Sequence, residues 1–230
     1  MTARPAKCPD LETLPQRERA YRSLRDRILE NSWPPGTQML EEEVAVNLGM
    51  SRTPVREALI RLEEEGLVTV KPRHGMQVRG ISPDDMREIH EILLQLEPMA
   101  ARLAAEKGHG EAELADVFGL LDEMERALTV GDIVAWGHAD RLFHREIVYL
   151  SGNGHLCDIT NRIWGQQYRA LMATLRLRPS RTLCNRDHRA VANAIRGGDG
   201  VKARAIHLAH CTARGQMLVD LVRYHGLSAL

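Results

Sequence analysis

Aromatic residues are scarce in this sequence, at 4% of 230 residues, whereas alanine, leucine, arginine and glutamate are plentiful. This composition favours helices over sandwiches or barrels, so we expect a mostly α fold. Long apolar runs are missing too, because no window approaches the roughly 18 uninterrupted apolar residues of a membrane helix. Since domains usually contain roughly 100–150 residues, we expect two modest, soluble domains.

Cysteine occurs only four times and never as a Cys-x-x-Cys pair. The N-terminus has no apolar stretch that resembles a signal peptide. Both absences favour a reducing cytoplasm as the location of the protein.

Net charge is also absent, because 31 basic residues balance 31 acidic ones. The two parts on either side of Gly80 carry 13 basic against 12 acidic residues and 18 against 19. Neither part is basic overall, so a nucleic-acid-binding surface must depend on where particular arginines lie.

The first 80 residues have the pattern of a helix-turn-helix. Residues 1–16 contain three prolines and predict an irregular arm. Apolar residues at helical spacing then predict a first helix that ends near Asn31, a short second helix over 40–48 and a third helix over 51–65. Hydroxyl groups at the start of the third helix can cap its free amides.

Two short apolar strands follow the third helix, over 67–70 and 76–78, around a basic turn. This hairpin predicts a wing. A cap residue, a proline and two acids at 82–85 then predict a new helix, so we expect a boundary between domains 1–80 and 81–230.

The second domain shows no strand signal and predicts a six-helix antiparallel bundle. Pro98 lies inside the first of these helices and should kink it. The expected helices span 83–107, 111–129, 132–150, 154–177, 181–197 and 199–225.

Metal-ligand residue types recur on the predicted bundle helices. Asp140 and His144 are four residues apart and so share one helix face, and His188 and His210 lie on two further helices among apolar neighbours. Three imidazoles and one carboxylate that converge in a bundle core would suit a divalent ion, although each histidine alone could be structural or exposed. The remaining histidines and two cysteines are interpreted as structural, core or exposed residues: His90, His109, His138, His155, His207, His225, Cys157 and Cys211.

The N-terminal pattern resembles the GntR family of winged-helix regulators. The residues that carry the resemblance are 48–59 (LGMSRTPVREAL), 62–68 (LEEEGLV) and the Arg-His-Gly tip at 73–75. At that tip His74 and Gly75 would reach the minor groove, since glycine permits a close approach.

Arg52 and Arg56 lie one turn apart at the start of the third helix, where the arginine fork suits the two acceptors of guanine. Ser51 and Thr53 can hold phosphates. Glu42 departs from the family pattern, because many relatives have an arginine there that contacts DNA.

The C-terminal pattern resembles the FCD ligand-binding domain, in the smaller VanR-like branch of the FadR subfamily. Asp-x-x-Phe-His, then Ser-Gly-Asn, then two histidines 22 residues apart carry this resemblance. It implies that Asp140, His144, His188 and His210 bind one divalent ion, with zinc, nickel and manganese as candidates. Leu93 departs from the pattern, since relatives place an arginine there, so Arg169 is a candidate to contact the effector instead.

These features together predict a homodimeric transcriptional regulator, a repressor that binds a pseudo-palindromic operator and senses a small carboxylate at a metal-containing pocket. It is not expected to be an enzyme. Two alternatives remain open at this point: a metal-dependent enzyme, since a metal with vacant positions could activate water, and a metal that only staples the bundle.

Overall fold

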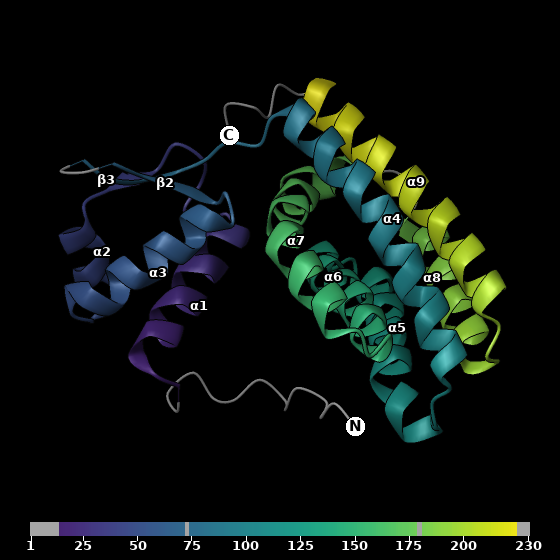
Figure 1. Ribbon diagram of the computed structural model, residues 1–230. Coiled ribbons are helices and arrows are strands. Elements are labelled where there is room, and N and C mark those ends of the chain that lie inside the picture. The colour runs from purple at the N-terminus through teal and green to yellow at the C-terminus, as the bar shows by residue number, and fades with distance from the viewer. Residues whose placement is uncertain (1–13, 72–73, 179–180, 225–230) are drawn as a thin grey trace.

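A computed structural model of the protein describes residues 14–71, 74–178 and 181–224 (Figure 1). The expected mostly α fold is confirmed, with a winged helix-turn-helix in the N-terminal part and helices alone in the C-terminal part of the described chain. Most of the arm expected at 1–16 lies outside the described residues, as do two residues of the wing turn, 72–73. None of the described helices has the length and hydropathy of a membrane span.

The N-terminal part packs around the third helix. Its apolar stripe of Val55, Ala58, Leu59 and Leu62 is buried and lies against the first two helices, as the spacing predicts. The elements of this part are α1 (Gln16–Leu29), β1 (Gln38–Met39), α2 (Glu41–Leu48), α3 (Arg52–Glu64), β2 (Val68–Lys71) and β3 (Gly75–Val78).

Ser51 precedes α3 but makes no side-chain capping bond, so the prediction of hydroxyl capping by this residue is wrong. Its hydroxyl stays on the exposed surface instead. The turn between α2 and α3 is made by Gly49, whose φ of 62° is left-handed and so suits glycine.

The wing contains one strand more than expected. β3 pairs antiparallel with β2 and, on its other side, with β1, in the order β1-β3-β2. β1 has two residues, too few for an alternating pattern to reveal it. It approaches the wing so closely that a Cβ atom on Gly75 would lie 2.1 Å from the carbonyl oxygen of Met39.

The six helices expected in the C-terminal part are confirmed within a few residues at each end. Ser82 caps the first by accepting a bond from the backbone N–H of Asp85 (2.9 Å), after which the helix runs as one element through the buried Pro98. α4 and α9 lie side by side along one flank (Figure 1). The helices are α4 (Pro83–Lys107), α5 (Glu111–Val130), α6 (Ile133–Leu150), α7 (Gly154–Thr174), α8 (Arg181–Arg196) and α9 (Gly200–Tyr224); a 3₁₀ turn, η2 (Leu175–Leu177), extends α7.

The two parts of the chain touch through α7, which lies beside α1 (Figure 1). Gln166 Nε2 donates to the carbonyl oxygen of Glu65 at 3.2 Å. A Cβ atom on Gly165 would lie 3.3 Å from Arg25 and 3.5 Å from Leu67, so glycine allows the helix to approach the winged helix closely. The α7 helix therefore has one face on the winged helix and another toward the other helices of the bundle.

Candidate functional site

Two arginines at the start of α3 lie on the surface of the winged helix. The side chains of Arg52 and Arg56 are 68% and 72% exposed, so both are accessible to a large ligand. Each lies near the carboxylate of Glu41, at 3.8 and 3.9 Å. Ser51 and Thr53 are exposed on the same end of α3.

The three successive glutamates of α2 differ in their surroundings. Glu41 faces the two arginines, and Glu43 accepts a bond from the backbone N–H of Leu40 at 2.7 Å, while Glu42 is exposed. At the wing, His74 is exposed and Gly75 is buried. A buried residue offers little surface to DNA, so the packing of Gly75 against β1 is the better-supported reason for glycine at this position.

The histidines expected to bind metal come together inside the bundle. Nε2 of His188 lies 3.2 Å from Nε2 of His144 and 3.0 Å from Nε2 of His210, and all three side chains are buried. They come from α6, α8 and α9. Asp140, one turn before His144, has its Oδ1 at 3.6 Å from Nε2 of His188.

Burial keeps the three imidazoles neutral. It is the main cause that lowers the pKa of His144, His188 and His210 well below the usual value, and nearby positive charge, such as Arg214 for His144, lowers it further. Neutral imidazoles have a lone pair to offer a metal.

Asp140 is 1% exposed, yet neither of its carboxylate oxygens has a hydrogen-bond partner among the described residues. Burial raises the pKa of this carboxyl, although Arg178 and Arg214 oppose the shift. Buried carboxylates are normally paired or bound to a metal. This orphaned carboxylate beside three converging imidazole nitrogens fits a divalent ion.

Glu97 of α4 is a part of the site that the sequence analysis missed. It is 1% exposed, and its Oε2 lies 2.9 Å from Nδ1 of His144, the ring nitrogen on the other side from His188. Its carboxylate also accepts bonds from Trp164 Nε1 (3.1 Å) and Arg214 Nη2 (2.9 and 3.0 Å).

The sequence did carry a signal for Glu97, since this acid lies four residues after Leu93 in the apolar stripe of its helix. A carboxylate on a buried helix face requires a partner. The partner, Arg214, is 117 residues away, so only the fold identifies it. Relatives have an arginine at the position of Leu93, but here Leu93 is buried and uncharged. The cation beside Glu97 is instead Arg214, which comes from α9.

Two more residues approach Glu97 and were interpreted from the sequence as structural. Cys211 Sγ is 3.4 Å and His207 Nε2 is 3.6 Å from Oε2 of Glu97. With His144 these residues form a second group of potential ligands, all buried.

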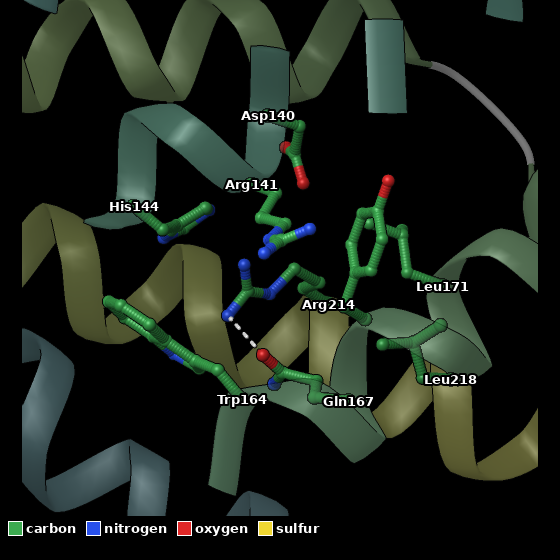
Figure 2. Close-up of a pocket in the computed structure, with 9 residues that line it drawn as sticks. Asp140, Arg141, His144, Trp164, Gln167, Leu171, Arg214 and Leu218 are labelled. Atoms are coloured by element: carbon green, nitrogen blue, oxygen red, sulfur yellow. Dashed lines mark hydrogen bonds between the residues drawn. The ribbon is translucent and has the colours of Figure 1, made fainter. Parts of the chain in front are cut away.

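A pocket opens beside the histidine cluster, and Figure 2 shows Arg141 and Arg214 facing each other inside it. Arg214 donates a 3.4 Å bond to Gln167, and Arg141 lies over the ring of Tyr168, 4.5 Å from its centre. The pocket has a volume of about 340 Å³, its open mouth included. It is lined by Asp140, Arg141, His144, Trp164, Gln167, Tyr168, Leu171, Arg214 and Leu218.

Arg169, the sequence-based candidate for effector contact, does not line this pocket. It is buried, and its guanidinium donates to the carbonyl oxygen of Arg79 near the start of α4. The neighbouring Tyr168 lines the pocket instead, because one step along a helix rotates the side chain by about 100°.

Family models match both parts of the chain. Residues 16–78 match the family described as bacterial regulatory proteins, gntR family, and residues 88–213 match the FCD domain. An uncharacterized HTH-type transcriptional regulator of Agrobacterium vitis is 42% identical over 131 residues, which cover 56% of this chain and 77% of that one. A probable D-xylose utilization operon transcriptional repressor of Paenarthrobacter nicotinovorans is 32% identical over 175 residues, 75% of each chain.

The regulator McbR of Escherichia coli K12 is 32% identical over 141 residues, which span 63% of that relative, less than two thirds of its length. The solved structure of E. coli McbR/YncC superposes with a TM-score of 0.79 at 24% identity, covering 90% of this chain and 99% of that one. At this identity the likeness concerns the fold. From the two family matches and these relatives, the chain belongs to the GntR family of bacterial regulatory proteins and is a DNA-binding transcriptional regulator with an FCD effector-binding domain.

Proposed function

We propose that this protein is a homodimeric repressor that binds a pseudo-palindromic operator and senses a small organic acid at a metal-containing pocket. Helix α3 enters the major groove, where Arg52 and Arg56 read guanine and Ser51 and Thr53 hold phosphates. His74 reaches the minor groove from the wing. The exposure of both arginines supports this arrangement.

One divalent ion per subunit is bound by Asp140, His144, His188 and His210. The observation that carries this proposal is the approach of His188 Nε2 to the Nε2 atoms of His210 and His144, at 3.0 and 3.2 Å, beside a buried carboxylate that has no hydrogen-bond partner among the described residues. Imidazole and carboxylate donors suit zinc, nickel or manganese. An ion bound by one carboxylate and neutral imidazoles keeps a net positive charge and attracts an anion.

The effector is a small carboxylate held in the pocket beside His144. Arg141 and Arg214 both line this pocket, and two guanidinium groups in one small space favour an anion between them.

Helix α7 couples the pocket to the winged helix. Trp164, Gln167 and Tyr168 line the pocket, while Gln166 on the same helix donates to the backbone of Glu65. Movement of the pocket face therefore displaces the contact with the winged helix. A coupling of about 1–3 kcal/mol would change operator affinity roughly 5–150-fold.

We also propose that the domain boundary falls near residue 80, between the two family matches at 16–78 and 88–213. The six helices that follow the winged helix agree with the smaller, VanR-like branch of the FadR subfamily.

A thermal-shift screen of organic acids on the zinc-loaded protein tests the sensing proposal, with operator affinity measured for every acid that stabilises it. We expect at least one small carboxylate to raise the melting temperature and change operator affinity in the wild type, and to do neither in Asp140→Ala. If an acid stabilises both proteins equally, the metal takes no part in sensing. If metal is bound but no acid changes DNA affinity, the metal has only a structural role in the helical bundle.

Metal analysis of the purified protein tests the ligand set. We expect one divalent ion per subunit in the wild type and none when His144, His188 and His210 are replaced together by asparagine. An unchanged metal content in this variant would remove the three histidines from the site.

A further inference from the structure

We infer that Glu97 is a positioning residue that keeps the ring proton of His144 on Nδ1, so that Nε2 faces His188 and His210 as a lone-pair donor. This inference rests on the proposed metal site, but it concerns a side chain outside the ligand set. The ring of His144 lies between two groups. Nε2 lies 3.2 Å from Nε2 of His188, and Nδ1 lies 2.9 Å from the carboxylate of Glu97.

A neutral imidazole has one ring proton, and the partner of one nitrogen decides which nitrogen keeps it. A carboxylate only accepts hydrogen bonds, so Glu97 favours a proton on Nδ1 of His144. In strict hydrogen-bond geometry Nδ1 has no partner among the described residues, and at 2.9 Å the Glu97 oxygen is close enough to accept after a small rotation of the ring. Carboxylates that orient a metal-bound histidine in this way raise its basicity as a ligand.

The remaining neighbours of Glu97 are donors that hold the carboxylate in place. Trp164 from α7 and Arg214 from α9 both donate to it, and the guanidinium balances its buried charge. The carboxylate therefore keeps its orientation toward His144 because three helices converge on it.

The same surroundings argue against a second metal ion held by Glu97, His207 and Cys211. The guanidinium of Arg214 already lies 2.9 Å from Glu97, and a cation there would be repelled by it. Cys211 Sγ lies 3.4 Å from Oε2 of Glu97, where the thiol can donate to that carboxylate.

The variant Glu97→Gln distinguishes an effect of Glu97 on the ring proton of His144 from an effect on packing, because glutamine has nearly the same shape as glutamate. The oxygen of the new amide should turn to the donors Arg214 and Trp164, which leaves its NH₂ group directed at Nδ1 of His144. An amide that donates to Nδ1 moves the ring proton to Nε2, where it blocks metal binding. Cys211→Ala is the matched control, because it removes another contact of Glu97 while both Glu97 and His144 keep their side chains.

The experiment records ¹⁵N NMR spectra of the histidine rings in metal-free full-length protein, with His144 assigned from His144→Gln, and then titrates each protein with Zn²⁺ alone. We expect Nδ1–H in the wild type, Nε2–H in Glu97→Gln, and a zinc affinity about 10–100-fold lower in that variant. Cys211→Ala should bind one zinc ion with the affinity of the wild type.

A wild-type spectrum dominated by Nε2–H overturns the inference even if Glu97→Gln fails to fold, because that measurement needs no variant at Glu97. Unchanged zinc affinity in a folded Glu97→Gln also overturns it. Loss of a second zinc ion in Cys211→Ala would instead assign Glu97 to a second metal site. If the wild type binds no zinc although His144 has Nδ1–H, the proposed metal site fails while the positioning of the proton stands.

Discussion

Glu41 places a carboxylate within 4 Å of Arg52 and Arg56, at 3.8 and 3.9 Å; both arginine side chains are largely exposed, whereas that of Glu41 is 19% exposed. Ion pairs this long, with the cation in solvent, stabilise a protein by about 0–1 kcal/mol, so the arginines can leave Glu41 for another partner at little cost. Their contribution to folding is therefore small and their contribution to DNA binding can be measured without unfolding the protein.

Arg52→Ala and Arg56→Ala should each weaken binding to the preferred DNA sequence by about 1–3 kcal/mol and relax the preference for guanine, because each removes the bidentate base contact that we propose for it. His74→Ala should weaken binding more evenly across sequences. The measurement is competition binding at fixed salt, with DNA selected by the wild type from a randomised duplex library. Arg87→Ala, an exposed arginine on α4, is the control. A wild type that selects no consensus sequence would contradict the proposed readout.

The close approach of β1 to the wing depends on a glycine. In the wing, Gly75 has a φ of 75° and no room for a Cβ atom, because the carbonyl oxygen of Met39 occupies that space. Gly36 is similar in backbone, with a φ of 85°, but has no atom within 4 Å of its Cβ position.

Gly36→Ala should therefore destabilise the protein by about 1–2 kcal/mol, the cost of a left-handed backbone alone. Gly75→Ala should cost clearly more and also weaken DNA binding, because β1 must separate from the wing. Urea unfolding and DNA affinity measure the two effects. Equal losses of stability in the two variants would mean that the contact with Met39 has no energetic importance.

At α7, Gly165 allows the helix to approach α1 and the residues before β2. Gly165→Leu should separate the winged helix from α7, because a larger side chain would overlap Arg25, Leu29 and Leu67. The operator affinity of this variant should then no longer respond to the effector. Gly119→Leu is the matched control, since Gly119 also lies in a helix but has no atom within 4 Å of its Cβ position.

Hydrogen exchange on α1 and operator affinity with and without effector check this prediction. Faster exchange in α1 is expected for Gly165→Leu alone. If that variant responds to the effector as the wild type does, coupling does not pass through the contact between α7 and the winged helix.

At the scale of the whole molecule, the buried histidines link folding stability to pH. Burial lowers the pKa of His144, His188 and His210 in the folded protein, so below about pH 6.5 the unfolded chain binds more protons than the folded one. The free energy of unfolding of the metal-free protein should therefore fall as the pH falls from 7 to 5, by on the order of 1 kcal/mol per pH unit for each histidine.

Denaturant unfolding at several pH values measures this slope. The variant with asparagine at all three positions removes the three titrating groups and should flatten the profile. The same slope in that variant would mean that other groups control the acid sensitivity of the fold.

Most of the secondary structure follows from local sequence. Period-3.6 apolar stripes, glycine turns and the Ser82–Pro83 start of α4 are sufficient to locate the helices, because these signals act within a few residues. The likeness to the GntR and FCD families was also evident from short motifs. Apolar neighbours on three helices made a meeting of His144, His188 and His210 conceivable, and the resemblance to the FCD family implied it.

Only the tertiary structure shows which residues and strands meet across the molecule. Arg214 reaches Glu97 across 117 residues, β1 is recognisable only because β3 lies beside it, and Arg169 turns to the backbone of Arg79 rather than to the pocket. For the two arginines the physical reason is the same. A sequence pattern determines which face of a helix is buried, whereas the identity of the group opposite a buried charge depends on how α4, α7 and α9 pack against one another.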